Sequence, residues 1–413
     1  MRDWALPGTR RIEIRDPDLT ALTDIDKAAE IDARRVGLSP RRVNRIWQAV
    51  ENVYRSRVHP GLSFCLRYKG EIVLNRAIGH ARGVSPDCPP GPQSVPMATD
   101  TPVCLFSASK AIIAVLTHKL AETGAIDLDA PVSRYLPEFS GRGKTHTTLA
   151  QVLAHRGGFP CFPEGDGDPA ILGDWDGCIA RICAAPADAG GQRLAYHAIT
   201  SGYILGEVIQ RVTGTALTAY LDETLRKPLG MRYFTYGLDG RSHSRVATHH
   251  IAGMPVRWPV SKWVRDAISC SFDDAVRLSN QSLFMKTVIP SGNLYATADE
   301  LARFYQMMLD DGRYGDTRVL APETVARLRR PAGRPATDDM LKLPMRYSQG
   351  LMLGMNPIGL YGPMSGQAFG HYGFMNIAGW ADPGRDLSVG LLTTGKAVLG
   401  GHLLPVVRLL AEI

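Results

Sequence analysis

Ser107 and Lys110 are the residues whose types and spacing suggest chemistry most directly. They open an apolar run over residues 111–116, which predicts a helix that ends near Gly124. Residues three positions apart on a helix share a face, so the serine hydroxyl and the lysine amine can meet. A serine hydroxyl attacks poorly at neutral pH unless a base takes its proton, and burial can lower the pKa of a lysine enough for that task. The helix start also offers unpaired N–H groups to an oxyanion, although a capping serine beside an exposed lysine explains the same spacing.

Two later stretches carry further candidates. Tyr196 and His197 precede an expected helix over residues 202–212, and a tyrosine close to a lysine and a serine can relay a proton. Residues 369–374 join glycines, His371 and aromatic residues ahead of an expected strand. Glycines there would let the backbone approach a ligand closely, and the histidine could hydrogen-bond an acyl or leaving group. Taken singly, each stretch is more typical of packing or of a structural turn than of a functional site.

Other patterns argue against several functions. Residues 390–396 imitate a phosphate loop, but Ala397 stands where a serine or threonine must meet magnesium, so we expect a strand and a turn. His243, His249 and His250 have no acidic or cysteine partner at ligand spacing, and we expect no metal site. The sequence has no Gly-x-Ser-x-Gly, which argues against an α/β-hydrolase.

Composition indicates an ordinary globular protein. The chain has 413 residues, 45% hydrophobic and 21% charged, with a formal net charge of +7. No dense basic run occurs, which favours a mixed solvated surface over a nucleic-acid groove. The seven scattered cysteines form no Cys-x-x-Cys pair, as is typical of free thiols in a reducing compartment. The first thirty residues hold charges throughout and no run approaches a membrane span, so we expect a cytoplasmic protein with no signal peptide.

The expected elements place a helical middle between two strand-rich ends. Residues 1–38 look like an irregular lead-in, Ser39-Pro40 is a typical helix start, and residues 62–68 and 71–78 around Lys69-Gly70 predict a hairpin. The remaining predictions are loops over 81–102 and 288–297, helices over 149–154, 202–212, 301–309 and 403–410, and strands over 350–355, 375–381 and 387–393. This order implies an α+β protein with one sheet built from both chain ends and an inserted helical lobe.

Three ordered motifs resemble a known superfamily. Ser107-Ala-Ser-Lys110, Tyr196-His-Ala198 and His371-Tyr-Gly373 are similar to motifs of the serine β-lactamase and penicillin-binding-protein-like superfamily, in particular class C β-lactamases, D-alanyl-D-alanine carboxypeptidases and family VIII carboxylesterases. Residues 128–137, 153–158 and 292–299 support the resemblance, which covers roughly residues 40–412. It implies a β-lactamase/transpeptidase-like fold with an antiparallel sheet flanked by helices. The implied lobes are 39–106 with 340–413 and the helical 107–339, with the active site between them.

The resemblance also implies a role for each motif. Ser107 would be acylated, Lys110 would help to deprotonate it, and Tyr196 would act as general base and acid. The backbone N–H groups of Ser107 and Phe374 would form the oxyanion hole. His371 would replace the lysine usual in β-lactamases. The other substrate-binding candidates, at or beside the third motif, are Gly373, Tyr372 and Trp380. No metal or cofactor is implied.

Two departures favour the esterase branch. Ala198 replaces the asparagine of the second motif, and His371 removes a fixed cation for a β-lactam carboxylate. We therefore expect a serine carboxylesterase that hydrolyses small or medium esters through an acyl-enzyme. Three alternatives stay open: an acyltransferase that uses the same site, a weak β-lactamase or D-amino-acid peptidase, and a pseudoenzyme that binds without turnover.

Overall fold

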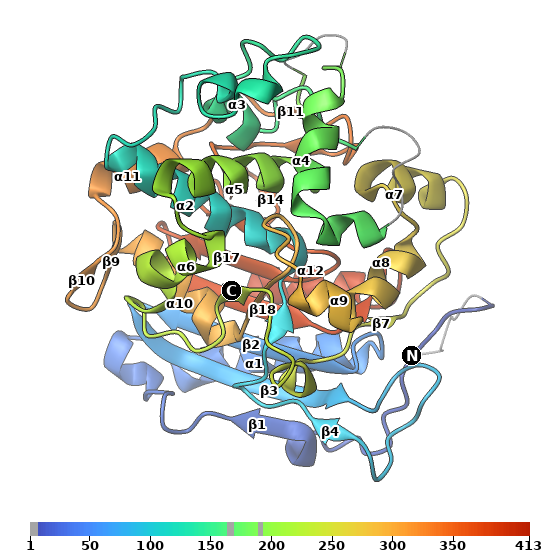
Figure 1. The fold of residues 1–413 in the computed structure, drawn as a ribbon. Helices are drawn as coiled ribbons and strands as arrows, with labels where there is room; N and C mark the ends of the chain where they lie inside the picture. Colours follow the sequence, from blue (N-terminus) through green and yellow to red (C-terminus); the bar gives the residue numbers. More distant parts are fainter. Residues whose placement is uncertain (1–6, 163–168, 189–192) are drawn as a thin grey trace.

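A central antiparallel sheet organises the molecule. The computed structural model describes residues 7–162, 169–188 and 193–413. The sheet follows the order β1-β3-β2-β18-β17-β16-β13, with β4 paired to β3. The strands are β1 (Thr23–Ile25), β2 (Gly61–Tyr68), β3 (Glu71–Arg82), β4 (Val95–Pro96), β13 (Met352–Leu353), β16 (Phe369–Tyr372), β17 (Ala378–Asp382) and β18 (Leu387–Thr393). Figure 1 shows this sheet crossing the lower half of the molecule, below most of the helices.

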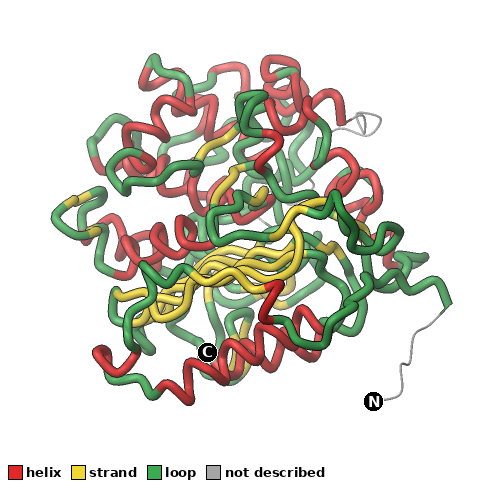
Figure 2. The backbone as a smooth tube through the Cα atoms, turned by 90° about the horizontal axis from the view of Figure 1, so that it is seen from below, coloured by secondary structure: helices red, strands yellow, loops and turns green. Residues whose placement is uncertain are grey.

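Strands from the two halves of the sequence meet in the middle of this sheet. β2 pairs with β18 over seven residues, from Leu62 opposite Thr393 to Tyr68 opposite Leu387. Both strands are buried along most of their length, because helices cover both faces of the sheet, as Figure 2 shows. This arrangement confirms the predicted α+β class and the predicted sheet built from both chain ends.

Helices α1 (Pro40–Arg55) and α12 (Leu403–Glu412) pack together on one face of the sheet, and α10 (Ala298–Leu309) packs on the other. The α1 helix begins as predicted, with Ser39 accepting a hydrogen bond from the Arg42 N–H and proline in the first turn. Its Ile46, Val50 and Val53 are buried against the sheet. Each buried aliphatic side chain of this kind contributes about 1.5–3 kcal/mol to stability.

The helical part of the chain surrounds α2 (Lys110–Glu122), whose residues 110–118 are all buried. The α5 helix (Thr200–Thr213) packs against it. The other helices are α3 (Leu149–Leu153), α4 (Trp175–Ala184), α6 (Leu217–Leu221), α7 (Val260–Ile268), α8 (Phe272–Ser279), α9 (Ser282–Lys286) and α11 (Pro322–Arg329). A small sheet joins β5 (Val103–Cys104), β8 (Leu294–Ala296) and β6 (Thr235–Tyr236). The paired short strands are β7 (His250–Ile251) with β19 (Gly395–Lys396), β9 (Arg313–Tyr314) with β10 (Thr317–Arg318), β11 (Ala336–Thr337) with β12 (Pro344–Met345), and β14 (Ile358–Gly359) with β15 (Gly362–Pro363).

Several short strands contradict the sequence predictions. The predicted irregular lead-in contains β1, and the two predicted loops contain β4 and β8. The segment with His371, expected as a turn, is β16. The strand predicted over 350–355 is limited to β13. Strands of two to four residues carry too little alternation to be recognised, and they form here through pairing with other strands: β1 and β4 pair with the long β3, and β8 pairs with β5 and β6.

Candidate active site

Ser107 lies in a tight 3-10 turn, η3 (Phe106–Ser109), directly before α2. Phe106, the preceding residue, has a φ of 46°, in the left-handed region that residues with a Cβ seldom adopt. Two hydrogen bonds fix this turn to β8: the Leu105 N–H donates to the Leu294 carbonyl (2.8 Å), and the Ser109 hydroxyl accepts the Leu294 N–H (3.0 Å). Ser109 is therefore buried and occupied, whereas Ser107 opens onto a cavity.

Lys110 is the first residue of α2, and its side chain lies in the protein interior. Its Nζ lies 3.3 Å from Ser107 Oγ, 2.6 Å from the Ala198 carbonyl oxygen and 3.2 Å from the Ser291 carbonyl oxygen. Burial holds the pKa of Lys110 well below its usual value of 10.5. A neutral amine has two N–H groups and one lone pair. Because the two carbonyls can only accept hydrogen bonds, the lone pair is left for the Ser107 hydroxyl.

Tyr196 also lies beside this pair, as predicted. The Lys110 Nζ is 4.7 Å from the centre of the Tyr196 ring, and Tyr196 is only 5% exposed. Burial raises the pKa of Tyr196, and a hydrogen-bond interaction with the Ser107 side chain opposes that rise. The hydroxyl is thus a neutral proton donor near neutral pH. The structure brings all three predicted catalytic side chains together.

Asp338 supports Tyr196, and sequence reasoning missed it. Its buried carboxylate accepts the N–H groups of Tyr196 (3.1 Å), Met340 (2.9 Å) and Leu341 (2.9 Å), and the Tyr347 hydroxyl at 3.3 Å. This anion also raises the pKa of Tyr196. The only signal in the sequence is an aspartate two residues before Met340, a common turn pattern, which says nothing about a partner more than a hundred residues away.

His155 packs against the ring of Tyr196. Its ring centre lies 4.7 Å from that of Tyr196 and 4.9 Å from that of Tyr347. Its Nδ1 accepts the His197 N–H at 3.2 Å, which ties the Tyr196 segment to the end of α3. His155 and His197 are therefore packing residues, and burial lowers the pKa of both.

His371 faces the site from β16. Its ring centre lies 6.3 Å from that of Tyr196, and its Nδ1 lies 2.7 Å from the Tyr372 carbonyl oxygen. A carbonyl only accepts, so Nδ1 carries the proton and Nε2 keeps its lone pair. Nε2 is buried and has no partner among the described residues. Burial, reinforced by Lys110, lowers the pKa of His371 to about 3, so the ring is neutral at neutral pH.

Tyr372 and Trp380, the two aromatic residues predicted to bind substrate, do not line the cavity that contains Ser107, and their predicted roles stay predictions. Successive residues of a strand point to opposite faces of its sheet, so Tyr372 turns away from the face of His371. It packs on Tyr361 and donates its hydroxyl to the Leu360 carbonyl at 2.6 Å. Trp380 is 1% exposed and stacks on the same Tyr361, in the core beneath α1 and α12.

Gly373 and Phe374 connect β16 to the nucleophile turn. A Cβ at Gly373 would collide with the Leu105 carbonyl oxygen, so only glycine allows this approach. The Phe374 ring lies 5.5 Å from the Phe106 ring, and Phe374 lines the cavity together with Ser107. Its N–H makes no hydrogen bond with any described residue. The two residues predicted to supply the oxyanion donors, Ser107 and Phe374, therefore line the same cavity.

That cavity has a volume of about 320 Å³ and a mainly apolar lining. Besides Ser107, Phe106 and Phe374, its lining includes Phe162, Ile171, Leu172, Ile199, Ile268, Leu278, Leu283, Phe284 and Ile289. Such a pocket suits a hydrocarbon chain or ring better than a polar or charged group. In the described part of the chain, no three histidine, cysteine or acidic side chains are grouped so as to hold a metal ion. No helix there is long and apolar enough to cross a membrane.

Comparisons with known proteins agree with this geometry. Residues 46–411 match the family model described as Beta-lactamase. The chain is 28% identical over 309 residues to the Esterase/beta-lactamase LipL of Mycobacterium tuberculosis, covering 72% of this chain and 70% of that protein. It is 31% identical over 300 residues to Esterase EstB of Burkholderia gladioli, covering 67% and 72%. The crystal structure of a family VIII carboxylesterase superposes with a TM-score of 0.76 at 27% identity, covering 90% of this chain and 97% of that one.

The family model spans most of the chain, and EstB passes 30% identity over two thirds of it. The chain therefore belongs to the beta-lactamase family. It is a serine hydrolase of that family with the β-lactamase/transpeptidase fold, as the motifs predicted.

Proposed function

We propose that this chain is a serine carboxylesterase that hydrolyses esters with an apolar acyl group through an acyl-enzyme at Ser107. The observation that carries the proposal is the contact of Ser107, which lines a mainly apolar cavity, with a buried Lys110 that forms no ion pair with any described residue. The esterases among the relatives support the same reaction. The predicted small-molecule ester partner follows from the proposal, and no metal or cofactor is needed for it.

In the first half of the reaction, neutral Lys110 takes the Ser107 proton as Oγ attacks the ester carbonyl carbon. The carbonyl oxygen becomes an oxyanion that the N–H groups of Ser107 and Phe374 stabilise. Tyr196 donates its proton to the leaving alcohol oxygen as the C–O bond breaks, and Lys110 returns a proton to Tyr196. In the second half, water attacks the acyl carbon and gives a proton to neutral Lys110 through the Tyr196 hydroxyl. As the bond between the acyl carbon and Ser107 Oγ breaks, Lys110 returns that proton to Oγ and the carboxylic acid leaves.

The third motif argues for neutral esters over β-lactams. A β-lactam antibiotic carries a carboxylate that needs a cation, but His371 is neutral at neutral pH and its free Nε2 can only accept a hydrogen bond. A carboxylate placed there would meet a lone pair. An uncharged ester avoids the free-energy cost of burying a carboxylate that has no cation or hydrogen-bond donor beside it.

The proposal is tested with p-nitrophenyl acetate, butyrate and octanoate, and with the β-lactam nitrocefin. The wild-type chain should hydrolyse the esters and show an intact-mass increase of one acyl group when quenched during turnover. Nitrocefin should turn over at least 10²-fold less efficiently. Ser107→Ala should remove both the turnover and the adduct.

Ser109→Ala is the matched control, because its hydroxyl only caps the Leu294 N–H. It should lower the free energy of unfolding by about 1–2 kcal/mol and leave ester turnover within a few-fold of wild type. Ester turnover that survives Ser107→Ala, or nitrocefin turnover that exceeds ester turnover, would refute the proposed activity.

A further inference from the structure

A second buried lysine, Lys396, contacts Phe106 and Met375, the chain neighbours of Ser107 and Phe374, and takes no part in the mechanism above. It belongs to β19, inside the stretch that imitates a phosphate loop in the sequence, and its side chain is fully buried. Its Nζ donates to the Thr393 carbonyl at 2.9 Å and lies 3.5 Å from the Met375 carbonyl oxygen. The same Nζ lies 5.1 Å from the centre of the Phe106 ring.

These contacts join the two chain segments that carry the proposed oxyanion donors. Phe106 directly precedes Ser107, and Met375 directly follows Phe374. Both residues have left-handed backbones, with φ of 46° and 51°, so neither segment rests in a conformation that it would favour alone. Thr393 adds to the connection, because its hydroxyl donates to the Met375 and Asn376 carbonyls at 3.3 and 3.1 Å.

The surroundings of Lys396 contain titratable groups but no described carboxylate. The groups that influence it, or that it influences, are the Cys104 thiol of β5, His249 before β7 and His59 before β2. Burial raises the pKa of Cys104 to about 12 and lowers the pKa values of both histidines, so all three are neutral near neutral pH. Burial also lowers the pKa of Lys396, to about 7, with Cys104 opposing the shift.

We propose that Lys396 is a positioning residue for the oxyanion site: its ammonium holds the Met375 carbonyl and the Phe106 ring together, and so keeps the N–H groups of Phe374 and Ser107 aimed at one point. The hydrogen bond to a carbonyl needs only an N–H, whereas the attraction to the ring face needs the positive charge. The inference rests on the proposed function, because an oxyanion forms only if Ser107 attacks a carbonyl group.

A pair of ketone inhibitors separates oxyanion binding from ordinary binding. Ser107 Oγ adds to the carbonyl carbon of an octyl trifluoromethyl ketone, its proton passes to the neutral amine of Lys110, and the carbonyl oxygen becomes an oxyanion. The matching octyl methyl ketone fills the same cavity but adds far less readily. The ratio of the two inhibition constants therefore reports on the oxyanion site.

At pH 6, where Lys396 is charged, Lys396→Met should lower this ratio at least tenfold. It should lower kcat for p-nitrophenyl butyrate by a similar factor and leave KM within about twofold of wild type. The difference between variant and wild type should narrow at pH 8.5, because the wild-type lysine is then neutral. The melting temperature at pH 6 should be unchanged or higher, since methionine removes a buried charge.

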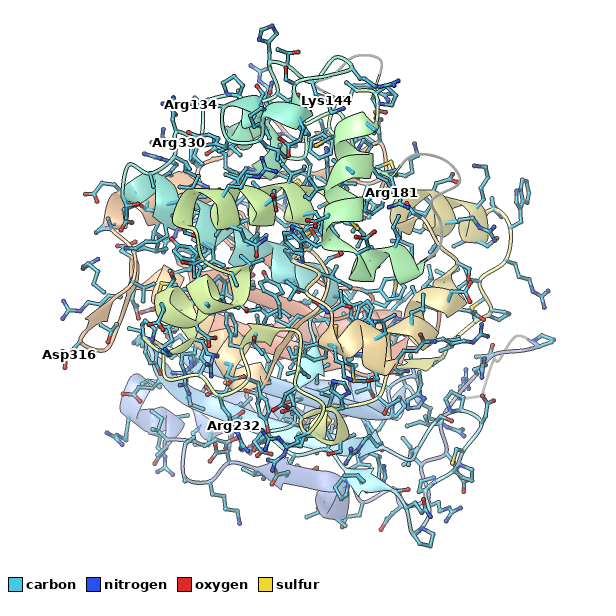
Figure 3. All side chains as sticks on the ribbon, viewed as in Figure 1. Arg134, Lys144, Arg181, Arg232, Asp316 and Arg330 are labelled. Carbon is cyan, nitrogen blue, oxygen red and sulfur yellow. The ribbon has the colours of Figure 1, made fainter. Side chains whose placement is uncertain are left out.

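Lys144→Met is the matched control. Lys144, labelled at the top of Figure 3, is also fully buried, donates to the Cys183 and Ala185 carbonyls and lies 5.4 Å from the centre of the Phe139 ring. It touches neither Ser107 nor Phe374, so the inhibitor ratio should stay within twofold of wild type.

The outcomes are distinct. A Lys396→Met chain that discriminates between the ketones as well as wild type would overturn the role of Lys396 alone. If that variant does not fold, Lys396→Gln keeps an N–H donor without the charge, and a wild-type ratio in it would overturn the role equally. A wild-type chain that binds both ketones alike would overturn the proposed function and this inference with it.

Discussion

Lys110 meets three oxygen atoms, and only one of them can give up a proton. The carbonyls of Ala198 and Ser291 accept its hydrogens, and the Ser107 hydroxyl is the remaining neighbour. Because no described carboxylate pairs with this lysine, burial acts on its pKa without opposition. The same three contacts would hold a protonated lysine as well. The protonation state of Lys110 therefore decides whether the serine is activated.

This dependence predicts the pH profile of the enzyme. The neutral amine is the active form, so kcat/KM should be low at acidic pH and rise as Lys110 loses its proton. The rise should reach its plateau well below pH 10.5, because burial lowers the pKa of Lys110. Initial rates with p-nitrophenyl butyrate from pH 5 to 10, corrected for spontaneous hydrolysis, measure the profile. Lys110→Met should lower kcat/KM by about 10² or more and lose this rise. A wild-type midpoint near 10.5 would contradict the assignment.

At the scale of elements, β16 and the nucleophile turn form one unit. The chain leaves β16 at Gly373, passes against the Leu105 carbonyl and continues to Phe374. The Gly373 N–H donates to the Ile377 carbonyl at 2.8 Å, which closes the turn from β16 to β17. The spacing between the two proposed oxyanion donors thus depends on residue 373 being a glycine, which has no Cβ.

Adding one methyl group at this position should damage catalysis. In Gly373→Ala the new Cβ would push β16 away from Leu105, because neither backbone can yield without breaking the sheet. We expect kcat to fall at least tenfold and the free energy of unfolding to fall by about 1–3 kcal/mol. Gly141→Ala is the control, since a Cβ there meets nothing within 4 Å. Steady-state kinetics and urea unfolding check both variants, and an alanine at position 373 without effect would show that the two segments are not coupled.

Local signals were enough for some elements and not for others. The capped start of α1 and the hairpin of β2 and β3 were predicted from the sequence because each forms from neighbouring residues. β16 was missed because its four residues, with one glycine and one histidine, show no strand alternation. Its pairing with β17 and β13 stabilises the strand instead. Because the strand was missed, Tyr372 was expected to lie beside the site together with His371. Asp338 was missed because its partner Tyr196 is far away in the sequence.

At the scale of the whole molecule, buried neutral histidines link stability to pH. Burial lowers the pKa values of His118, His197 and His250 to about 4 and that of His371 to about 3. The same side chains in the unfolded chain titrate near their usual 6.5. Between these values the unfolded state binds more protons, so acidification favours unfolding.

The free energy of unfolding should therefore fall with acidification over the whole range from pH 8 to 5. Above about pH 7 the unfolded chain binds more protons at Lys110 and Lys396, whose folded pKa values are lowered, and below about pH 6.5 it binds more at the histidines. We expect a loss of more than about 1 kcal/mol per pH unit between pH 6 and 4, since one full proton difference changes stability by about 1.4 kcal/mol per unit. Urea unfolding followed by circular dichroism at pH 8, 7, 6 and 5 measures this slope. Equal stability at pH 7 and 5 would mean that these histidines become protonated inside the folded protein.

The pairing of β2 with β18 has a consequence for how the protein is made. A ribosome delivers β2 and β3 early, yet the neighbour that completes the centre of the sheet is synthesised only after every helix from α2 to α11. Until β18 is synthesised, the edge of β2 that pairs with it stays without a partner strand. An unpaired apolar strand edge of this kind favours aggregation. Because the central strands of the sheet are far apart in the sequence, we expect the protein to fold slowly and to need chaperones during synthesis.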